Sequence, residues 1–283
     1  MLGKLFAHEW KDTWKLMAIM NAAVVVLSVI GAVFFHRNAS VIKPFFDSME
    51  SSGGDTLYFL GCMCYFMLLV LSIVVLSVGG IIYFYIRFYR NLYTDQGYLM
   101  HTLPVNAHQL IMSKTLVCLI WRIISALVVV IGVLTLIVSA FGEEINMSEI
   151  IDMVRQTMDY FGGFRAVLFA LLAILGMLGK ALFTAFTGYT CISIGQLAAK
   201  NKVLAAIGVY FGMRVLFQII GTFGSQYLVI LETITPYSIT ELMQDNENAV
   251  LAGMFIMVVV SYLLCVALYA IIHSIMHKRL NLD

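Results

Sequence analysis

Six apolar segments constrain this chain more than any other feature of its sequence. Each is about 20 residues or longer, the length a helix needs to cross a hydrocarbon core of about 30 Å. Lipid offers no hydrogen-bond partner to the backbone, so each segment is expected to be helical. The segments are 16–35, 57–86, 115–141, 167–198, 203–223 and 250–275.

The composition indicates that the solvent of this chain is lipid. Hydrophobic residues make up 61% of the sequence and charged residues 12%, against roughly 25% charged residues in a soluble domain. A chain with so few charges cannot cover a water-facing surface. The net charge of +1 gives no general attraction to nucleic acid. We therefore predict an all-α, polytopic membrane protein with six transmembrane helices.

Basic residues are concentrated in alternate loops between these segments. One side holds Lys4, Lys11, Lys15, Arg87, Arg90, Lys114, Lys200, Lys202, Lys278 and Arg279. The other side holds Arg37, Lys43, Arg155 and Arg165, together with most of the acids. Short loops rich in lysine and arginine stay in the cytoplasm. An even number of spans then places both termini in the cytoplasm and the acidic loops outside.

The first 15 residues have the pattern of an amphipathic helix that lies on a membrane. Trp10 and Trp14 fall on the apolar face of such a helix, and Lys4 and Lys11 fall on its polar face. Tryptophan on the apolar face and lysine on the polar face are typical of interfacial helices. The alternative is a frayed cytoplasmic tail. The pattern favours an interfacial helix over residues 1–15.

The loop 87–114, between the second and third segments, contains signals for two short helices. Asp95 is placed to cap the first helix, and Pro104 ends it. That helix would carry Tyr98, Leu99, Thr102 and Leu103. Asn106 followed by Gln109 has the spacing of a capping box and starts the helix that enters the third segment. A polar linker needs no such construction, so we predict a folded cytoplasmic surface that docks another protein.

The sequence contains no recognisable motif for catalysis or metal binding. Gly179 and Lys180 resemble the end of a phosphate loop, but Ile174 stands where the first glycine is required. His101 and His108 are separated by a proline, so one helix cannot present both to a metal. The longest hydrophilic stretch is under about 30 residues, shorter than an ATP-binding domain. We expect no catalytic residue, metal ligand or cofactor on this chain.

Three cations fall inside the apolar segments, where a charge costs about 2.5–3.5 kcal/mol. Arg122 is about two turns into the third segment, close enough for its side chain to reach the cytoplasmic face. Lys180 and Arg214 lie near the middle of adjacent segments and are expected to share a depth. They either line a water-filled cavity, bind an anionic ligand, pair with Glu232, or are structural residues that reach the membrane surface.

The last extracellular connection, 225–248, contains an apolar run at 227–231. This run is too short to cross a membrane. One interpretation is a re-entrant helix that packs against protein at the outer face of the membrane. The other is an ordinary surface loop with one apolar patch.

The segment 95–114, DQGYLMHTLPVNAHQLIMSK, resembles the permeases of the type-2 ABC exporter superfamily, in the small six-span form common in Gram-positive bacteria. In that family a stretch similar to GYLxxTLPVSxxQLxxSK follows the second span. Asn106 stands where the family often has serine, and both residues cap helices. The six-span layout is also similar, so the resemblance covers nearly the full chain.

The resemblance implies a role for each part of the chain. Residues 1–15 would form an elbow helix ahead of the six-span domain, 16–283. The loop 196–202 would make a second, smaller contact with an ATPase, and 225–248 would form extracellular re-entrant helices. The coupling helix, which docks in the ATPase subunit, would include Asp95, Tyr98, Leu99, Thr102, Leu103, Pro104 and His108.

The resemblance also implies partners. Mg-ATP would bind a separate ATP-binding-cassette ATPase chain and not this one. Two permeases, identical or different, would assemble with two ATPase subunits in the bacterial plasma membrane. The exported substrate would be a peptide, a drug or a lipid-like molecule, a choice that rests on analogy.

Two other functional classes are consistent with six spans. A secondary transporter needs no ATPase, and it often shows internal repeats and acids within its spans. This sequence shows neither, because its acids lie in loops. A membrane scaffold or sensor protein is the other alternative.

Overall fold

The computed structural model of this chain describes most of the predicted spans. The described residues are 2–37, 53–94, 106–141, 151–152, 155–156, 162–198, 200–234 and 247–278. Within these ranges the regular structure is helical and no strand is present. The all-α fold class predicted from the sequence is therefore confirmed for the part of the chain that the structure describes.

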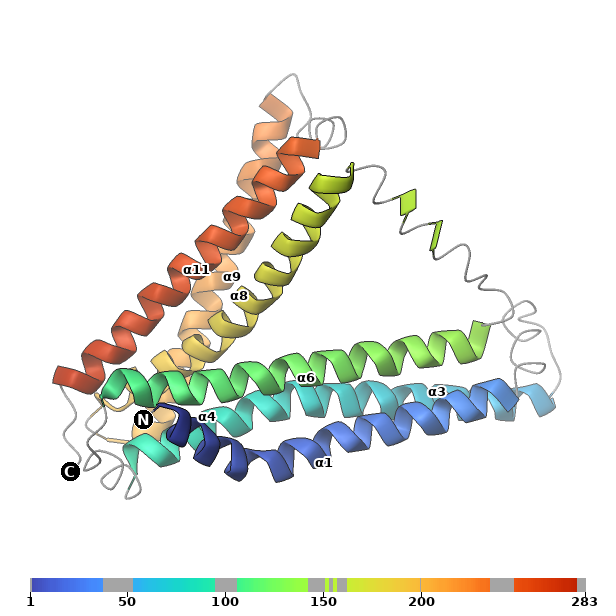
Figure 1. Cartoon of the computed structure of the whole chain (residues 1–283), viewed down its shortest axis with the longest axis horizontal. Helices are drawn as coiled ribbons and strands as arrows, with labels where there is room; N and C mark the ends of the chain where they lie inside the picture. Colours follow the sequence, from blue (N-terminus) through green and yellow to red (C-terminus); the bar gives the residue numbers. More distant parts are fainter. Residues whose placement is uncertain are drawn as a thin grey trace. The chain divides into compact units, whose positions relative to one another are not determined.

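Six helices are long and apolar enough to cross a membrane among the described residues (Figure 1). The helices are α1 (Leu2–Arg37), α3 (Gly53–Val74), a π-helical turn η1 (Val75–Gly79), α4 (Gly80–Tyr93), α6 (Ala107–Phe141), α8 (Gly163–Gly195), α9 (Lys202–Ile234) and α11 (Glu247–Lys278). The turn η1 joins α3 to α4, so these three elements make one span. Each predicted apolar segment falls on one of the six spans, and the prediction of a multi-pass protein is confirmed at this level.

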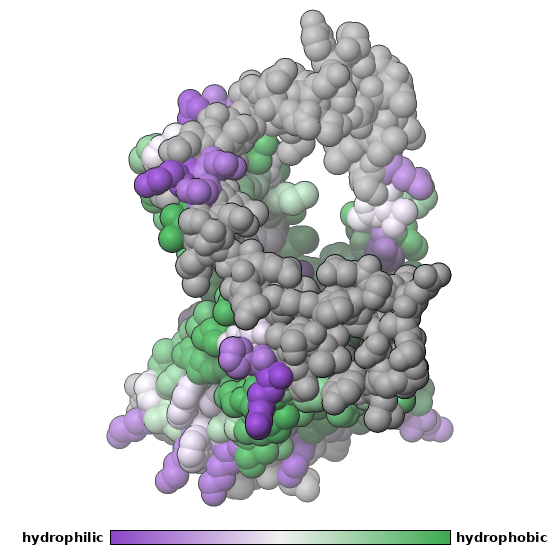
Figure 2. All heavy atoms as spheres, turned by 90° about the vertical axis from the view of Figure 1, so that its right-hand side faces the viewer, coloured by the Kyte–Doolittle hydropathy of each residue, from purple (hydrophilic) through white to green (hydrophobic). Residues whose placement is uncertain are grey.

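The described helices expose many apolar side chains, and some of the residues they bury are polar. Exposed side chains along α1 include Ile19, Val26 and Val33. Figure 2 shows hydrophobic side chains over much of the described surface, with hydrophilic side chains in a few separate groups. The buried polar residues are Glu9, Thr13, Asn21, Ser28, Ser113, Lys114, Thr115, Ser125, Thr187, Thr190 and Ser193. This distribution is expected where lipid, and not water, surrounds the helices.

The chain divides into two compact units. The first, here called the α1 unit, comprises Gly3–Phe84 and Leu116–Arg155. In it, α1 runs alongside α3 and the longer part of α6 (Figure 1). The Tyr65 hydroxyl of α3 donates a 2.7 Å hydrogen bond to the Leu27 carbonyl of α1. A glycine at position 31 makes this contact possible, because a Cβ atom there would overlap the Tyr65 ring.

The second unit, here called the α8 unit, comprises Tyr85–Thr115 and Gln156–Asp283, with Met1–Leu2. In its described part, α8 packs against both α11 and α9. The Tyr262 hydroxyl of α11 donates to the Leu175 carbonyl of α8 at 3.2 Å. Side chains of this unit that are at most 1% exposed include Phe88, Leu92, Ile111, Tyr189 and Ile272.

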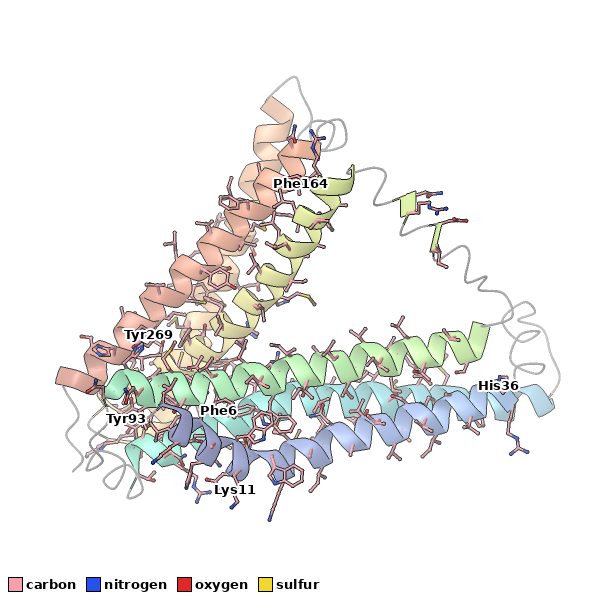
Figure 3. The ribbon with its side chains drawn as sticks, in the orientation of Figure 1. Phe6, Lys11, His36, Tyr93, Phe164 and Tyr269 are labelled. Carbon is pink, nitrogen blue, oxygen red and sulfur yellow. The ribbon has the colours of Figure 1, made fainter. Side chains whose placement is uncertain are left out.

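The predicted interfacial helix is the first part of α1 and not a separate element, because α1 is continuous from Leu2 to Arg37. Its first turns bend away from the axis of the rest (Figure 1). Trp10 stacks on Trp121 of α6, with ring centroids 4.9 Å apart. Trp14, predicted on the same face, is 49% exposed, and Lys11 points away from the helices (Figure 3). Contact with a membrane surface stays a prediction for this segment.

The predicted extracellular region 225–248 begins as a continuation of α9, which ends at Ile234. The apolar run 227–231 therefore extends a transmembrane helix and does not start a separate one. Residues 235–246 lie outside the described part of the chain, and α11 begins at Glu247. The re-entrant helices expected here stay a prediction for those twelve positions.

Candidate functional site

The structure describes the two ends of the loop that holds the predicted coupling site, up to position 94 and from position 106. Of its residues, His108 is within the described part of the chain. The other predicted residues, Asp95, Tyr98, Leu99, Thr102, Leu103 and Pro104, lie outside it. What the structure gives is the pair of helices from which the loop emerges: α4, which ends at Tyr93, and α6, which begins at Ala107.

The first end of the loop is fixed to α8. Phe88 stacks on Tyr189, with ring centroids 3.9 Å apart and planes 10° from parallel. One turn later, Leu92 is fully buried. The hydroxyls of Tyr93 and Ser193 lie 2.7 Å apart and share a hydrogen bond. The last turn of α4 is therefore packed and hydrogen-bonded onto α8 up to the residue before the loop.

The second end of the loop is fixed to α11. The Asn106 carbonyl accepts the Gln109 N–H at 2.9 Å, so α6 begins directly after Asn106, as its predicted cap position requires. His108 Nδ1 lies 2.5 Å from the Tyr269 hydroxyl of α11, at hydrogen-bonding distance. Tyr269 also contacts the edge of Phe186 on α8, with centroids 5.9 Å apart. Figure 3 labels Tyr93 on α4 and Tyr269 on α11.

Helices α8 and α11, which receive these two ends, are themselves tied together. The Thr190 hydroxyl, fully buried, lies 3.4 Å from the Leu268 carbonyl. The Cys265 thiol lies 3.8 Å from the Gly179 carbonyl. A Cβ atom at Gly179 would lie 2.7 Å from the Ser261 hydroxyl, which shows how closely the two helices approach. Helices α8 and α11 are therefore in close contact over much of their length.

The predicted cavity residues Lys180 and Arg214 are exposed in the single chain. The Arg214 guanidinium lies 5.8 Å from the centre of the Tyr210 ring, one turn earlier on α9. No ion pair of either cation is found among the described residues. For Glu232, whose backbone continues α9, the position of the side chain lies outside what the structure describes.

Along the pair of helices α8 and α9, the two cations lie at different levels. Helices α8 and α9 are antiparallel, and their register is set by two contacts. Phe183 packs edge-on against Phe217 at 5.1 Å, and Gly195 faces Ala206. In an antiparallel pair, the residue numbers of two facing positions add up to a constant, which is about 400 for these contacts. Arg214 is therefore level with position 186 or 187 of α8. Lys180 lies about two turns, or ~10 Å, further along.

Arg122 is held inside the α1 unit. Its Nη1 donates a 3.0 Å hydrogen bond to the Ser77 carbonyl, in the middle of η1. A π-helical turn disturbs the regular ladder of helical hydrogen bonds, and such turns often occur at functional sites. The expected reach of Arg122 to the cytoplasmic face is therefore replaced by a contact with the second span. The turn η1 ends at Gly79, and α4 begins at the adjacent Gly80.

The predicted second contact loop, 196–202, is a tight turn. Helix α8 ends at Gly195, and the Leu197 N–H donates to the Ile194 carbonyl at 3.0 Å. Asn201 has a positive φ of 53°, a conformation that asparagine tolerates. Gln196 is half-buried, and its buried Nε2 atom has no hydrogen-bond partner among the described residues.

Neither a metal site nor a relative identifies this protein. Among the described residues, no group of three or more His, Cys, Asp or Glu side chains is close enough to hold a metal ion. Comparisons with protein-family models, with curated proteins and with solved structures found no match to this chain.

Proposed function

We propose that this chain is the permease subunit of an ABC transporter, an exporter powered by ATP hydrolysis on a separate ATPase chain. The observation that supports it best is the anchoring of both ends of the loop 94–106. One end is fixed to α8 through Tyr93 and the other to α11 through His108. The resemblance of 95–114 to the coupling segment of exporter permeases supplies the identity of the partner.

The anchoring matters because a coupling loop must transmit displacement and not absorb it. A loop that leaves from frayed helix ends would bend when its partner moves. Here Leu92 and Ile111, which flank the loop, are fully buried. Closing of the ATPase subunits on Mg-ATP would therefore move α4, α6, α8 and α11 at their loop ends as one packed group. The turn at 196–202 would provide the second contact.

The proposal includes a second permease, identical or different, packed against α9. No residue in the apolar part of α9 is buried within the single chain. Space around Gly208 and Gly212 is open, since a Cβ atom at either would meet nothing within 4 Å. Small residues four apart allow close approach of another helix. Lys180 and Arg214, exposed on α8 and α9, would then line a polar space between the permeases instead of facing lipid.

The first test is the recovery of an ATPase. Tagged chain, purified from its native membrane in mild detergent, is expected to bring down an ATP-binding-cassette subunit in equal amount. The triple variant Tyr98→Ala, Leu99→Ala and Leu103→Ala is expected to lower that recovery about tenfold, which corresponds to ~1.4 kcal/mol of docking energy.

A matched control is the pair Ile151→Ala and Met153→Ala in the predicted extracellular loop, which should leave ATPase recovery unchanged. An equal loss in both variants would mean general misfolding. Transport by the purified chain alone, driven by an ion gradient, would contradict the proposal and favour a secondary transporter.

The second test concerns α9. Replacing Gly208 or Gly212 by leucine is expected to reduce permease pairing at least fivefold, because the bulky side chain separates the helix backbones. Pairing can be counted by single-molecule photobleaching of labelled chain in bilayers. Gly253→Leu on α11, where a Cβ atom also meets nothing within 4 Å, is the control. Unchanged pairing in both α9 variants would place the second permease elsewhere.

A further inference from the structure

Contacts on one face of the first turns of α1 fix how these turns are oriented. Glu9, Thr13 and Met17, spaced by four residues, are each at most 4% exposed. Trp10, on the same side, stacks on Trp121 of α6 with ring centroids 4.9 Å apart. These side chains hold one face of α1 against the α1 unit. The opposite face of the first four turns is therefore turned outward.

The outward face of these turns is basic. Lys4, His8, Lys11 and Lys15 are all exposed, and their spacing places them on one stripe of the helix. Lys11 points away from the helices (Figure 3). Asp12 is the one exposed acid in these turns, and its carboxylate lies 3.4 Å from His8 Nδ1. Within the part of the chain that the structure describes, none of the three lysines forms an ion pair.

The same stripe changes from basic to apolar at one position. Continued at helical spacing, it reaches Ile19, Val26 and Val33, which are all more than half exposed. These side chains belong to a helix that is long and apolar enough to span a membrane, and they form its lipid-facing side. The border between the hydrocarbon core and the headgroups therefore crosses this stripe between Lys15 and Ile19.

Trp14 marks the same border. It is 49% exposed and lies beside the basic stripe, between Lys11 and Lys15 in sequence. Tryptophan is enriched at the level of the lipid headgroups. Lys11 and Lys15 are one turn apart, so their Cβ atoms are about 5–6 Å from each other. Each ammonium group is carried on a flexible four-carbon chain, and both can therefore reach the phosphate of one lipid.

We propose that Lys11, Trp14 and Lys15 bind the headgroup of an anionic phospholipid. The two ammonium groups bond to its phosphate, and the Trp14 ring packs beside the upper part of its acyl chains. A zwitterionic lipid carries an additional positive group, which the lysines repel, so the site distinguishes lipids by their net charge. Basic residues next to a transmembrane helix are attracted to anionic lipids in this way. Binding holds the start of α1 at the membrane surface while its other face stays on α6.

The direct test uses Trp14 as a fluorescent reporter. The chain has three tryptophans, so the double variant Trp10→Phe and Trp121→Phe leaves Trp14 alone. It is placed in phosphatidylcholine vesicles that contain either phosphatidylglycerol or phosphatidylcholine brominated near the headgroup, which quenches tryptophan on contact. Quenching is expected to give at least about a fivefold preference for the anionic lipid, the effect of one lysine at a membrane surface. Adding Lys11→Gln and Lys15→Gln should abolish this preference.

Arg155→Gln is the matched control for the loss of charge. It removes an exposed cation of the same unit, in the predicted extracellular loop, and should leave the preference unchanged. Equal quenching by the two lipids, or a preference that survives the loss of both lysines, would overturn the proposal. Absence of quenching by either lipid would place Trp14 away from the headgroups and would overturn it as well.

A second measurement keeps all three tryptophans. Phosphatidylglycerol added to the chain in neutral detergent is expected to raise the thermal unfolding midpoint by about 2–4 °C, because a lipid that binds the folded chain stabilises it. Phosphatidylcholine should raise it less, and Lys11→Gln with Lys15→Gln should remove the difference. An equal rise with both lipids would reject the site. An equal rise with inorganic phosphate would show a site for free anions instead of a lipid.

Discussion

The variant Phe88→Ala is expected to lose about 3–5 kcal/mol of unfolding free energy, the range found when a buried aromatic side chain is truncated to alanine. Phe88 is 1% exposed, and its ring lies flat on Tyr189. Alanine would leave a cavity at the point where α4 meets α8, and the loss of the stack adds to the loss of packing. The effect is measurable as a lower midpoint of denaturation by sodium dodecyl sulfate in mixed micelles.

Phe211→Ala is the matched control for this prediction. Phe211 lies on α9 and is 65% exposed, so its truncation should change the unfolding free energy of the single chain by less than about 0.5 kcal/mol. Phe88→Ala should also reduce ATPase recovery, since the coupling loop would leave from a loosened helix end. Equal stability of the two variants would show that the packing around Phe88 does not hold this unit together.

The spans could be predicted from sequence because each depends on a local property. A run of about 20 apolar residues must be helical in lipid wherever it packs. The helix ends were harder to predict, since α1 begins well before the apolar run at position 16 and α9 continues past position 223. Backbone hydrogen bonding can continue beyond the last apolar residue, so a helix can be longer than the apolar run that predicts it. The bend near the start of α1 and the π-helical form of η1 were not predicted from the sequence.

The contacts at the candidate site could not be predicted, because they join residues far apart in the chain. Tyr93 and Ser193 are 100 positions apart, and His108 and Tyr269 are 161 apart. Sequence periodicity places each residue on a face of its own helix but does not say which helix that face meets. His108 was selected from its loop motif, whereas Tyr269 lies in an apolar run without any distinguishing signal.

The variant Gly195→Ala is expected to force α8 and α9 apart where they join. A Cβ atom at Gly195 would lie 2.5 Å from the Cβ of Ala206 and 2.6 Å from its backbone Cα and nitrogen. A flexible side chain can rotate out of such an overlap, but a backbone cannot, so the helices themselves must shift. Overpacking of this kind costs typically 1–3 kcal/mol, and we expect the upper part of that range. The change in denaturation midpoint measures it.

Gly253→Ala separates this overlap from the general effect of removing a helical glycine. Gly253 lies inside α11, and a Cβ atom there meets nothing within 4 Å. Since alanine favours helix over glycine by up to about 1 kcal/mol, this control should be neutral or slightly stabilising. Gly195→Ala should therefore lower the unfolding free energy, whereas Gly253→Ala should not. A stabilised Gly195→Ala chain would mean that α8 and α9 are not in backbone contact at this turn, and the register that separates Lys180 from Arg214 would lose one of its two supports.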